Sequence, residues 1–304
     1  MLHGTAQAMN FRMTPLPPVR RGLFTSGYRE YAARRAIERA WYTRAIRLVQ
    51  GRGRQQGLFV SLTSYAPRFA TLALTLKSLL LQELRPEAVL LWIGHADMAH
   101  LPDDVRELEP FGLRIIACDD HGPHTKYIHA LQHFPDARIA ICDDDTYYPP
   151  HWLGELLAGD QPGEIACQRI HRVALDPLGQ PLGYRWWAHD TDARDASILN
   201  FPTGVGGVLL RLDRFDPAVL DIGLARRLCP TTDDIWLYAM ARLAGTTFRL
   251  TGGHEPLTVW RTSQFTALWR TNVLEHGNDA HMAAVFAHFG AERLLGDVQA
   301  ALAA

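Results

Sequence analysis

The sequence is poor in lysine, in paired cysteines and in long apolar runs. Lysine supplies two of the 31 basic residues, and the four cysteines show no CxxC spacing or disulfide-like clustering. The most apolar stretch, residues 72–84, is interrupted by Lys77, Gln82 and Glu83, so we expect no membrane-spanning helix. The N-terminus lacks the charged-then-apolar order of a secretory signal. These absences favour a protein of a reducing cytoplasm.

Charge is distributed unevenly along the chain. Residues 1–56 contain eleven arginines and two acids, a net charge of +9, whereas the remainder carries a net charge of -10. Such a contrast indicates two physically distinct parts. We therefore expect a basic, helical N-terminal extension over residues 1–56 and one main domain over residues 57–304.

Within this extension, residues 28–49 have the pattern of a basic amphipathic helix. The apolar side chains recur at helical spacing at Ile37, Trp41, Ala45 and Leu48. The charge around them comes from Arg34, Arg35, Arg39, Arg44 and Arg47. Such a helix either packs its apolar stripe on the main domain or makes peripheral contact with an anionic membrane surface, where lipid-linked acceptors would be found. We expect no nucleic-acid partner.

The main domain alternates short apolar runs with helix-like segments, which predicts an α/β fold with a mostly parallel sheet flanked by helices. The expected strands are 58–62, 88–93, 113–117, 138–142 and 247–250, with a further apolar stretch at 164–173. The expected helices are 70–84, 103–109, 124–133, 233–243 and 280–289.

Three consecutive acids, Asp143, Asp144 and Asp145, follow the expected strand 138–142 directly. In an open α/β sheet, ligands bind beyond the carboxyl ends of the strands, so these acids lie where a site is expected. Adjacent carboxylates repel one another unless a cation or strong hydrogen-bond donors neutralise them. Oxygen ligands of this kind suit Mg²⁺ or Mn²⁺, whose shell is completed by water and substrate phosphates. A diphosphate substrate is therefore predicted.

A second pair of acids, Asp233 and Asp234, opens the expected helix 233–243. One carboxylate there would suffice to favour the helix dipole. Two adjacent carboxylates also suit a general base that must face an incoming hydroxyl group. Both interpretations stay open, as does the choice between the two residues.

Two other side chains are candidates on the same edge of the sheet. Lys126 lies where a loop enters a helix and is placed to contact phosphate. His254 follows an expected strand and is the first candidate for a further metal ligand, with His276 in reserve.

The segment at residues 60–68, VSLTSYAPR, resembles the opening of bacterial glycosyltransferases of the family 2-like GT-A group. More segments match in the same order: GP at 122–123 with Lys126, ICDDDTYYP at 141–149 with its DxD motif, TGVGGVL at 203–209, PTTDDIWL at 230–237, and ND at 278–279. The resemblance runs from about Leu58 to Phe289. Residues 1–56 have no counterpart in it.

This resemblance implies a GT-A fold and a metal-dependent glycosyltransferase of the hexosyltransferase kind. It would use a nucleotide-sugar, most commonly a UDP-sugar, and a glycan or lipid-linked acceptor in cell-surface polysaccharide synthesis. The implied nucleotide-sugar-binding residues are Ser61, Thr63, Tyr65, Arg68, Lys126, Asp143, Asp144, Gly206 and Gly207. The implied metal ligands are Asp145, as the principal one, and Asp143. Asp233 or Asp234 would be the base of an inverting displacement.

Three rival functions have distinguishable signatures. A phosphatase of the haloacid-dehalogenase type usually has Thr or Val two residues beyond its second Asp, where this chain has Tyr147. A nucleotidyltransferase should have a glycine- and basic-rich loop after the first strand, whereas residues 65–68 are glycine-free. A non-catalytic glycan- or protein-binding domain would use aromatic surfaces. Its candidates are Trp186, Trp187, Trp260 and Trp269.

Overall fold

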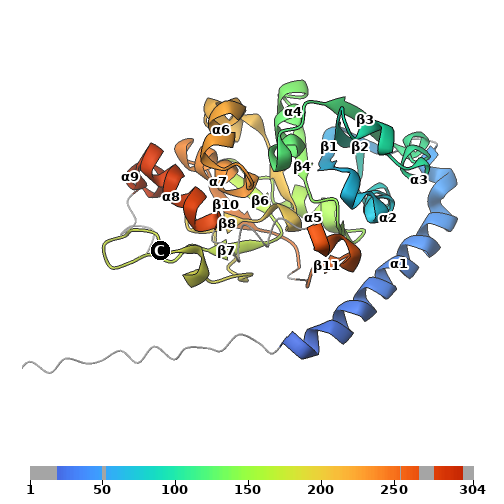
Figure 1. Cartoon of the computed structure of the whole chain (residues 1–304), viewed down its shortest axis with the longest axis horizontal. Coiled ribbons are helices and arrows are strands. Elements are labelled where there is room, and N and C mark those ends of the chain that lie inside the picture. The colour runs from blue at the N-terminus through green and yellow to red at the C-terminus, as the bar shows by residue number, and fades with distance from the viewer. Residues whose placement is uncertain (1–18, 50–52, 254, 267–276, 297–304) are drawn as a thin grey trace, which may run out of the picture.

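A seven-stranded sheet forms the centre of the protein (Figure 1). The computed structural model describes residues 19–49, 53–253, 255–266 and 277–296. The strand order is β10-β6-β9-β4-β1-β2-β3, and every neighbouring pair is parallel except the two that involve β9. The predicted α/β fold with a mostly parallel sheet is confirmed.

The strands of the central sheet are β1 (Arg54–Ser64), β2 (Arg85–Gly94), β3 (Leu113–Cys118), β4 (Arg138–Ile141), β6 (Glu164–Cys167), β9 (Val208–Leu210) and β10 (Thr247–Leu250). Two small antiparallel sheets pair β5 (Thr146–Tyr147) with β11 (Thr258–Val259), and β7 (Ile170–Arg172) with β8 (Asn200–Pro202). The apolar stretch at 164–173 therefore divides between β6 of the central sheet and β7 of a separate one.

Helices cover both faces of the central sheet (Figure 1). Their bounds are α1 (Val19–Val49), α2 (Phe69–Leu80), α3 (Asp103–Arg106), α4 (Thr125–His133), α5 (Trp152–Ala158), α6 (Ile222–Leu228), α7 (Asp233–Leu243), α8 (Gly277–Phe289) and α9 (Ala291–Leu295). Strand β1 shows how the faces divide, because successive side chains point to opposite sides. Phe59 packs in a core with α4 and α7, whereas Leu58, Val60 and Leu62 pack in a second core with α2 and α5.

Two helices end earlier than their apolar patterns predict. Helix α2 stops at Leu80 instead of residue 84, and the Gln82 side-chain amide then donates to the backbone oxygens of Ser78 and Pro149. These bonds tie the end of α2 to the turn after β5. Helix α3 stops at Arg106 and a 3₁₀ turn follows, which contains Pro110, a residue that has no N–H to continue a helix.

Helix α1 packs on the main domain, as one of the two interpretations of the extension predicted. Ala33 and Ile37 are buried in a small core with Leu81 and Trp260. Strand β1 begins at Arg54, so the sheet takes in the last residues assigned to the extension. No helix in the described part of the chain combines the length and hydropathy needed to cross a bilayer. All four cysteines are buried and unpaired.

Candidate active site

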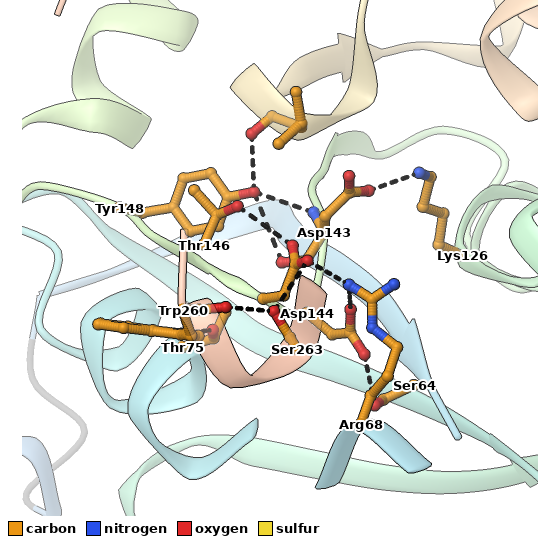
Figure 2. Close-up of polar contacts among 12 residues, drawn as sticks. Ser64, Arg68, Thr75, Lys126, Asp143, Asp144, Thr146, Tyr148, Trp260 and Ser263 are labelled. Carbon is orange, nitrogen blue, oxygen red and sulfur yellow. Dashed lines mark hydrogen bonds and ion pairs between the residues drawn. The ribbon is translucent and has the colours of Figure 1, made fainter. Parts of the chain in front are cut away.

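Two groups of carboxylates from distant parts of the chain meet beside the end of β4. Asp143, Asp144 and Asp145 follow that strand, and Asp233 and Asp234 begin α7. Two cationic side chains join them through ion pairs, Arg68 from the turn after β1 and Lys126 from the start of α4. We call these five acids and two cations the acidic site. Figure 2 shows its larger part.

Arg68 neutralises Asp144 and Asp145, the two buried acids of the triplet. Its guanidinium Nη2 lies 2.8 Å from Asp144 Oδ1 and 2.5 Å from Asp145 Oδ2. Ser64 at the end of β1 donates its hydroxyl to Asp144 Oδ2 at 2.5 Å. One positive charge is therefore shared by two carboxylates that are less than a tenth exposed. If Arg68 also contacts the nucleotide, as predicted, its guanidinium must bind the nucleotide while it keeps its ion pairs with these two acids.

Asp145 is also held from a segment near the C-terminal end of the chain. Trp260, directly after β11, donates its backbone N–H to the Asp145 carbonyl oxygen at 2.8 Å. The Ser263 hydroxyl donates to Asp145 Oδ2 at 3.2 Å, and the Trp260 indole N–H donates to Thr75 on α2 at 2.7 Å (Figure 2). Residues 258–263 therefore fix the backbone and the carboxylate of the predicted principal metal ligand.

Lys126 connects the two groups of acids. Its ammonium nitrogen lies 2.8 Å from Asp143 Oδ1 and 3.0 Å from Asp233 Oδ2, and its side chain is 7% exposed. Burial by itself would lower the pKa of Lys126, but Asp143, Asp233 and Asp234 raise it well above its ordinary value. Lys126 is thus a permanent cation at the centre of the site, and its predicted contact with phosphate would come in addition to these ion pairs.

The two acids of α7 differ in their surroundings. Asp233 is buried against Lys126, whereas Asp234 is partly exposed and accepts the backbone N–H of Gly204 at 2.8 Å. A Cβ atom on Gly204 would lie 3.0 Å from the Lys126 ammonium and 3.1 Å from Asp234 Oδ1. Glycine at this position lets the loop before β9 approach both charged groups.

Burial and neighbouring charges together determine the ionisation of the acidic site. Burial, reinforced by Asp233, raises the pKa of Asp234 to about 8. Burial also raises the pKa of Asp144 to about 7, although Arg68 opposes the change. Asp143 differs, because the adjacent Lys126 outweighs burial and holds the pKa of its carboxyl below the ordinary value. Its side chain is 31% exposed, so it presents an ionised carboxylate to a ligand.

A loop on the far side of Asp143 is attached through Tyr148. The Tyr148 hydroxyl accepts the Asp143 backbone N–H at 2.9 Å and donates to the Val205 carbonyl oxygen at 3.0 Å (Figure 2). Gly206 and Gly207, predicted to line a sugar pocket, are packed closely here. A Cβ on Gly206 would lie 2.5 Å from Arg169 Cβ, and one on Gly207 would lie 2.5 Å from the Trp152 ring.

A cavity of about 100 Å³ lies between the β5–β11 pair and α5, and Gly206 is among its lining residues, whereas Gly207 is not. Its wall combines aromatic rings with hydrogen-bonding groups. Among the lining residues are Tyr148, Trp152, Glu155, Gln168 and Glu255. Gln168 donates its side-chain amide to Glu155 at 3.0 Å, which orients both polar groups.

The residues predicted on β1 have different environments. Ser61 is fully buried, where its hydroxyl donates to the Lys126 carbonyl oxygen at 2.5 Å and accepts from the Trp92 indole at 2.9 Å. It therefore positions the start of α4, and its predicted contact with the nucleotide stays a prediction. Thr63 donates its hydroxyl to the Trp92 carbonyl oxygen at 2.9 Å and is partly exposed. The Tyr65 side chain is 37% exposed and is the most accessible of the three.

The donor atoms of the site fit a hard divalent cation. Mg²⁺ and Mn²⁺ typically take one or two protein carboxylates and complete their shells with water and phosphate oxygens. Asp143 offers such a carboxylate. Burial, with the neighbouring acids, raises the pKa of Asp144 and Asp145 although Arg68 opposes the change, so a cation at these carboxylates would favour their ionised form. Over the described ranges, no cluster of three or more His, Cys, Asp or Glu side chains forms an all-protein metal site.

Three predicted candidates lie outside the described residues: His254, His276 and Trp269. Trp187 and Trp260 are buried, which accounts for them as core residues, whereas Trp186 is 62% exposed. Sequence reasoning missed the contributions of Ser64, Tyr148, Gly204 and Ser263. Ser64 and Tyr148 stand inside the quoted motifs, but Ser263 has no recognisable local signal.

No protein-family model matches the chain, and no curated protein matches its sequence. Among solved structures, the chain is similar to the mannosyltransferase PcManGT from Pyrobaculum calidifontis in complex with GDP-Man and Mn²⁺, with a TM-score of 0.44, 15% identity, and coverage of 92% of this chain and 85% of that one.

It is also similar to residues 1–349 of TarS from S. aureus, with a TM-score of 0.44, 14% identity and coverage of 76% and 72%. A third is the inositol-1-phosphate CTP transferase from T. maritima, with a TM-score of 0.42, 10% identity and coverage of 75% and 96%. Likenesses at this level do not identify a family.

Proposed function

We propose that this protein is a metal-dependent glycosyltransferase that moves a sugar from a nucleoside-diphosphate sugar, with a UDP-sugar as first candidate, to a glycan or lipid-linked acceptor. The observation that carries the proposal is the joining of the two acid groups by Lys126, at 2.8 Å from Asp143 and 3.0 Å from Asp233. Transfer of a sugar needs a place for a diphosphate leaving group and a base for the acceptor, close together. We further propose that the enzyme acts in the cytoplasm, in the synthesis of a cell-surface polysaccharide.

The donor side is formed by the acid triplet and the turn after β1. A diphosphate is anionic and would be repelled by these carboxylates, so a cation must lie between them. A bound Mg²⁺ or Mn²⁺ would supply that charge and stabilise the negative charge that develops on the leaving diphosphate. Asp143 and Asp145 are the carboxylates that would hold the ion. Tyr65 is our candidate for the nucleoside contact, because its side chain is 37% exposed.

The acceptor side is formed by the start of α7, and Asp234 is our choice as the base. Asp233 is held by Lys126 and is buried, whereas Asp234 is partly exposed and has a pKa of about 8. A base works best when its pKa lies near the working pH, because it is then both available and strong enough to take the proton. Asp234 would accept the acceptor hydroxyl proton as that oxygen attacks the anomeric carbon, in an inverting displacement.

The cavity beside Gly206 is our candidate for a sugar subsite. Aromatic rings at Tyr148 and Trp152 and hydrogen-bond acceptors at Glu155 and Glu255 suit the apolar faces and the hydroxyl groups of a sugar. Tyr148 belongs both to this cavity and to the hydrogen bonds around Asp143, so the subsite adjoins the acidic site. A nucleotidyltransferase is the second candidate, since it would use the same donor-side acids without requiring Asp234.

The direct test is product release from activated nucleotides. The purified chain is incubated with UDP-, GDP- and TDP-sugars and with nucleoside triphosphates, each with and without Mn²⁺, and released products are measured. We expect one nucleoside-diphosphate sugar to release its nucleoside diphosphate only with metal, and Asp145→Asn to abolish this. Asp160→Asn, on the loop before β6, serves as the control. Release of pyrophosphate from a triphosphate would identify a nucleotidyltransferase, and no release from any compound would contradict catalysis.

A further inference from the structure

The outward face of helix α1 has a composition that the acidic site does not explain. At 31 residues the helix is about 46 Å long. Tyr28, Tyr31, Arg35, Arg39 and Tyr42 follow one another at intervals of three or four residues, so they share one side of the helix. All five are exposed, and the tyrosines are 73%, 61% and 91% exposed. We call these five residues the Tyr-Arg stripe.

The opposite side of α1 packs on the main domain. Ala33 and Ile37 pack on Leu81 and Trp260. Glu30 is buried there, and its carboxylate pairs with Arg34 at 2.8 Å and with Arg261 at 3.1 Å. The Tyr-Arg stripe therefore lies on the side of α1 away from these contacts, and its Arg39 also borders a cavity that Ile37 and Leu81 line. The helix need not leave the domain to present the stripe.

Charge identifies the kind of partner. Residues 1–56 carry a net charge of +9, and of their two acids Glu30 is turned inward while Glu38 pairs with Arg35 at 3.2 Å. The rest of the chain carries a net charge of -10 and would be repelled by an anionic surface. An anionic partner therefore meets the protein through α1. Tyrosine rings with hydroxyl tips, alternating with arginines along a helix, suit the headgroup level of a membrane.

We propose that the Tyr-Arg stripe binds the protein to a membrane surface rich in anionic phospholipids. Arg35 and Arg39 would interact with the lipid phosphates, and the three tyrosines would enter the interface between headgroups and acyl chains. This orientation holds the main domain on the membrane by a helix that also contacts the Trp260 segment. The proposal stands independently of the reaction catalysed.

Co-sedimentation with vesicles tests the proposal on the full chain. We expect it to pellet with vesicles of phosphatidylcholine and phosphatidylserine, and not with phosphatidylcholine alone. Arg35→Gln combined with Arg39→Gln removes two charges at the surface and should weaken binding about thirty-fold. The control is Arg226→Gln combined with Arg227→Gln on α6, which removes the same charge from exposed arginines elsewhere and should leave binding unchanged.

A second variant isolates the tyrosines. Replacing Tyr28, Tyr31 and Tyr42 by alanine leaves the charge unchanged and should also weaken binding to the anionic vesicles. Circular dichroism and thermal unfolding verify that every variant remains folded, as their exposed positions predict. A chain that stays in solution with anionic vesicles would overturn the proposal. So would equal losses in the α1 and α6 arginine variants, or a tyrosine variant that binds like the parent.

Discussion

Lys126→Met is expected to lower the free energy of unfolding by about 3–5 kcal/mol, because it leaves the buried Asp233 carboxylate and the partly exposed Asp143 carboxylate without their cation. The ammonium holds Asp143 and Asp233, and the Asp233 side chain is 6% exposed. Urea unfolding of the full chain measures the effect. The loss should be greatest near neutral pH. Since Lys126 lowers the pKa of Asp143, the stabilisation by this pair is present at pH values above the carboxyl's unfolded pKa and disappears as pH falls through its folded pKa.

The chain provides its own control, because Lys77 is its one other lysine. Lys77 is partly exposed and lies 5.6 Å from the Trp41 ring centroid, so Lys77→Met should cost no more than about 1 kcal/mol. Adding Asp233→Asn to Lys126→Met should restore part of the lost stability, since one unpaired charge is removed. Equal effects of the two lysine substitutions would contradict the central role of Lys126.

Asp234→Asn is expected to lower the turnover of the nucleotide-sugar by about a hundred- to ten-thousand-fold, the usual contribution of a general base. With no acceptor supplied, water takes its place and the release of nucleoside diphosphate is measured. Donor binding should remain, because Asp234 lies on the acceptor side. Asp104→Asn, an exposed acid in the first turn of α3, is the matched control and should retain full turnover. Turnover that survives in Asp234→Asn would exclude this residue as the base.

The pH dependence of turnover gives an independent readout of the same residue. The base acts when ionised, and the pKa of Asp234 is raised to about 8 by burial and by Asp233. Turnover should therefore rise with pH, with its midpoint near this value. Asp233→Asn removes the adjacent negative charge, so the midpoint should move to lower pH. If the midpoint of the profile does not move in Asp233→Asn, the group that titrates is not Asp234.

The parts of this protein that follow local rules were predictable from the sequence. Helix α7 and strand β10 have the predicted bounds, because each is a periodic or β-branched segment with a clear beginning and end. The position of the acid triplet at the end of β4 followed from the alternation of strands and helices. The two acids at the start of α7 were recognised as a pair with a possible catalytic role.

The contacts between these parts were not predictable in the same way. Lys126 was expected to contact phosphate from its loop, but its ion pairs depend on how α4 and α7 pack, and these are separated by about a hundred residues. Ser61 stands in a motif associated with nucleotide binding, yet the alternation of β1 turns it into the core. The Ser263 bond to Asp145 spans 118 positions and arises from the β5–β11 pairing, whose strands are two residues long.

Thermal unfolding with nucleotides tests the central claim most directly, because it needs neither the acceptor nor the donor sugar. Wild type and Asp145→Asn are heated with UDP, GDP, CMP or TDP, each with and without Mn²⁺. We predict that one nucleoside diphosphate raises the unfolding temperature of the wild type only with Mn²⁺, by an amount equivalent to about 2.7 kcal/mol at a hundredfold excess over Kd, and that Asp145→Asn loses this stabilisation. Unfolding temperatures unchanged by every nucleotide, with or without metal, would contradict a nucleotide-sugar site at these acids.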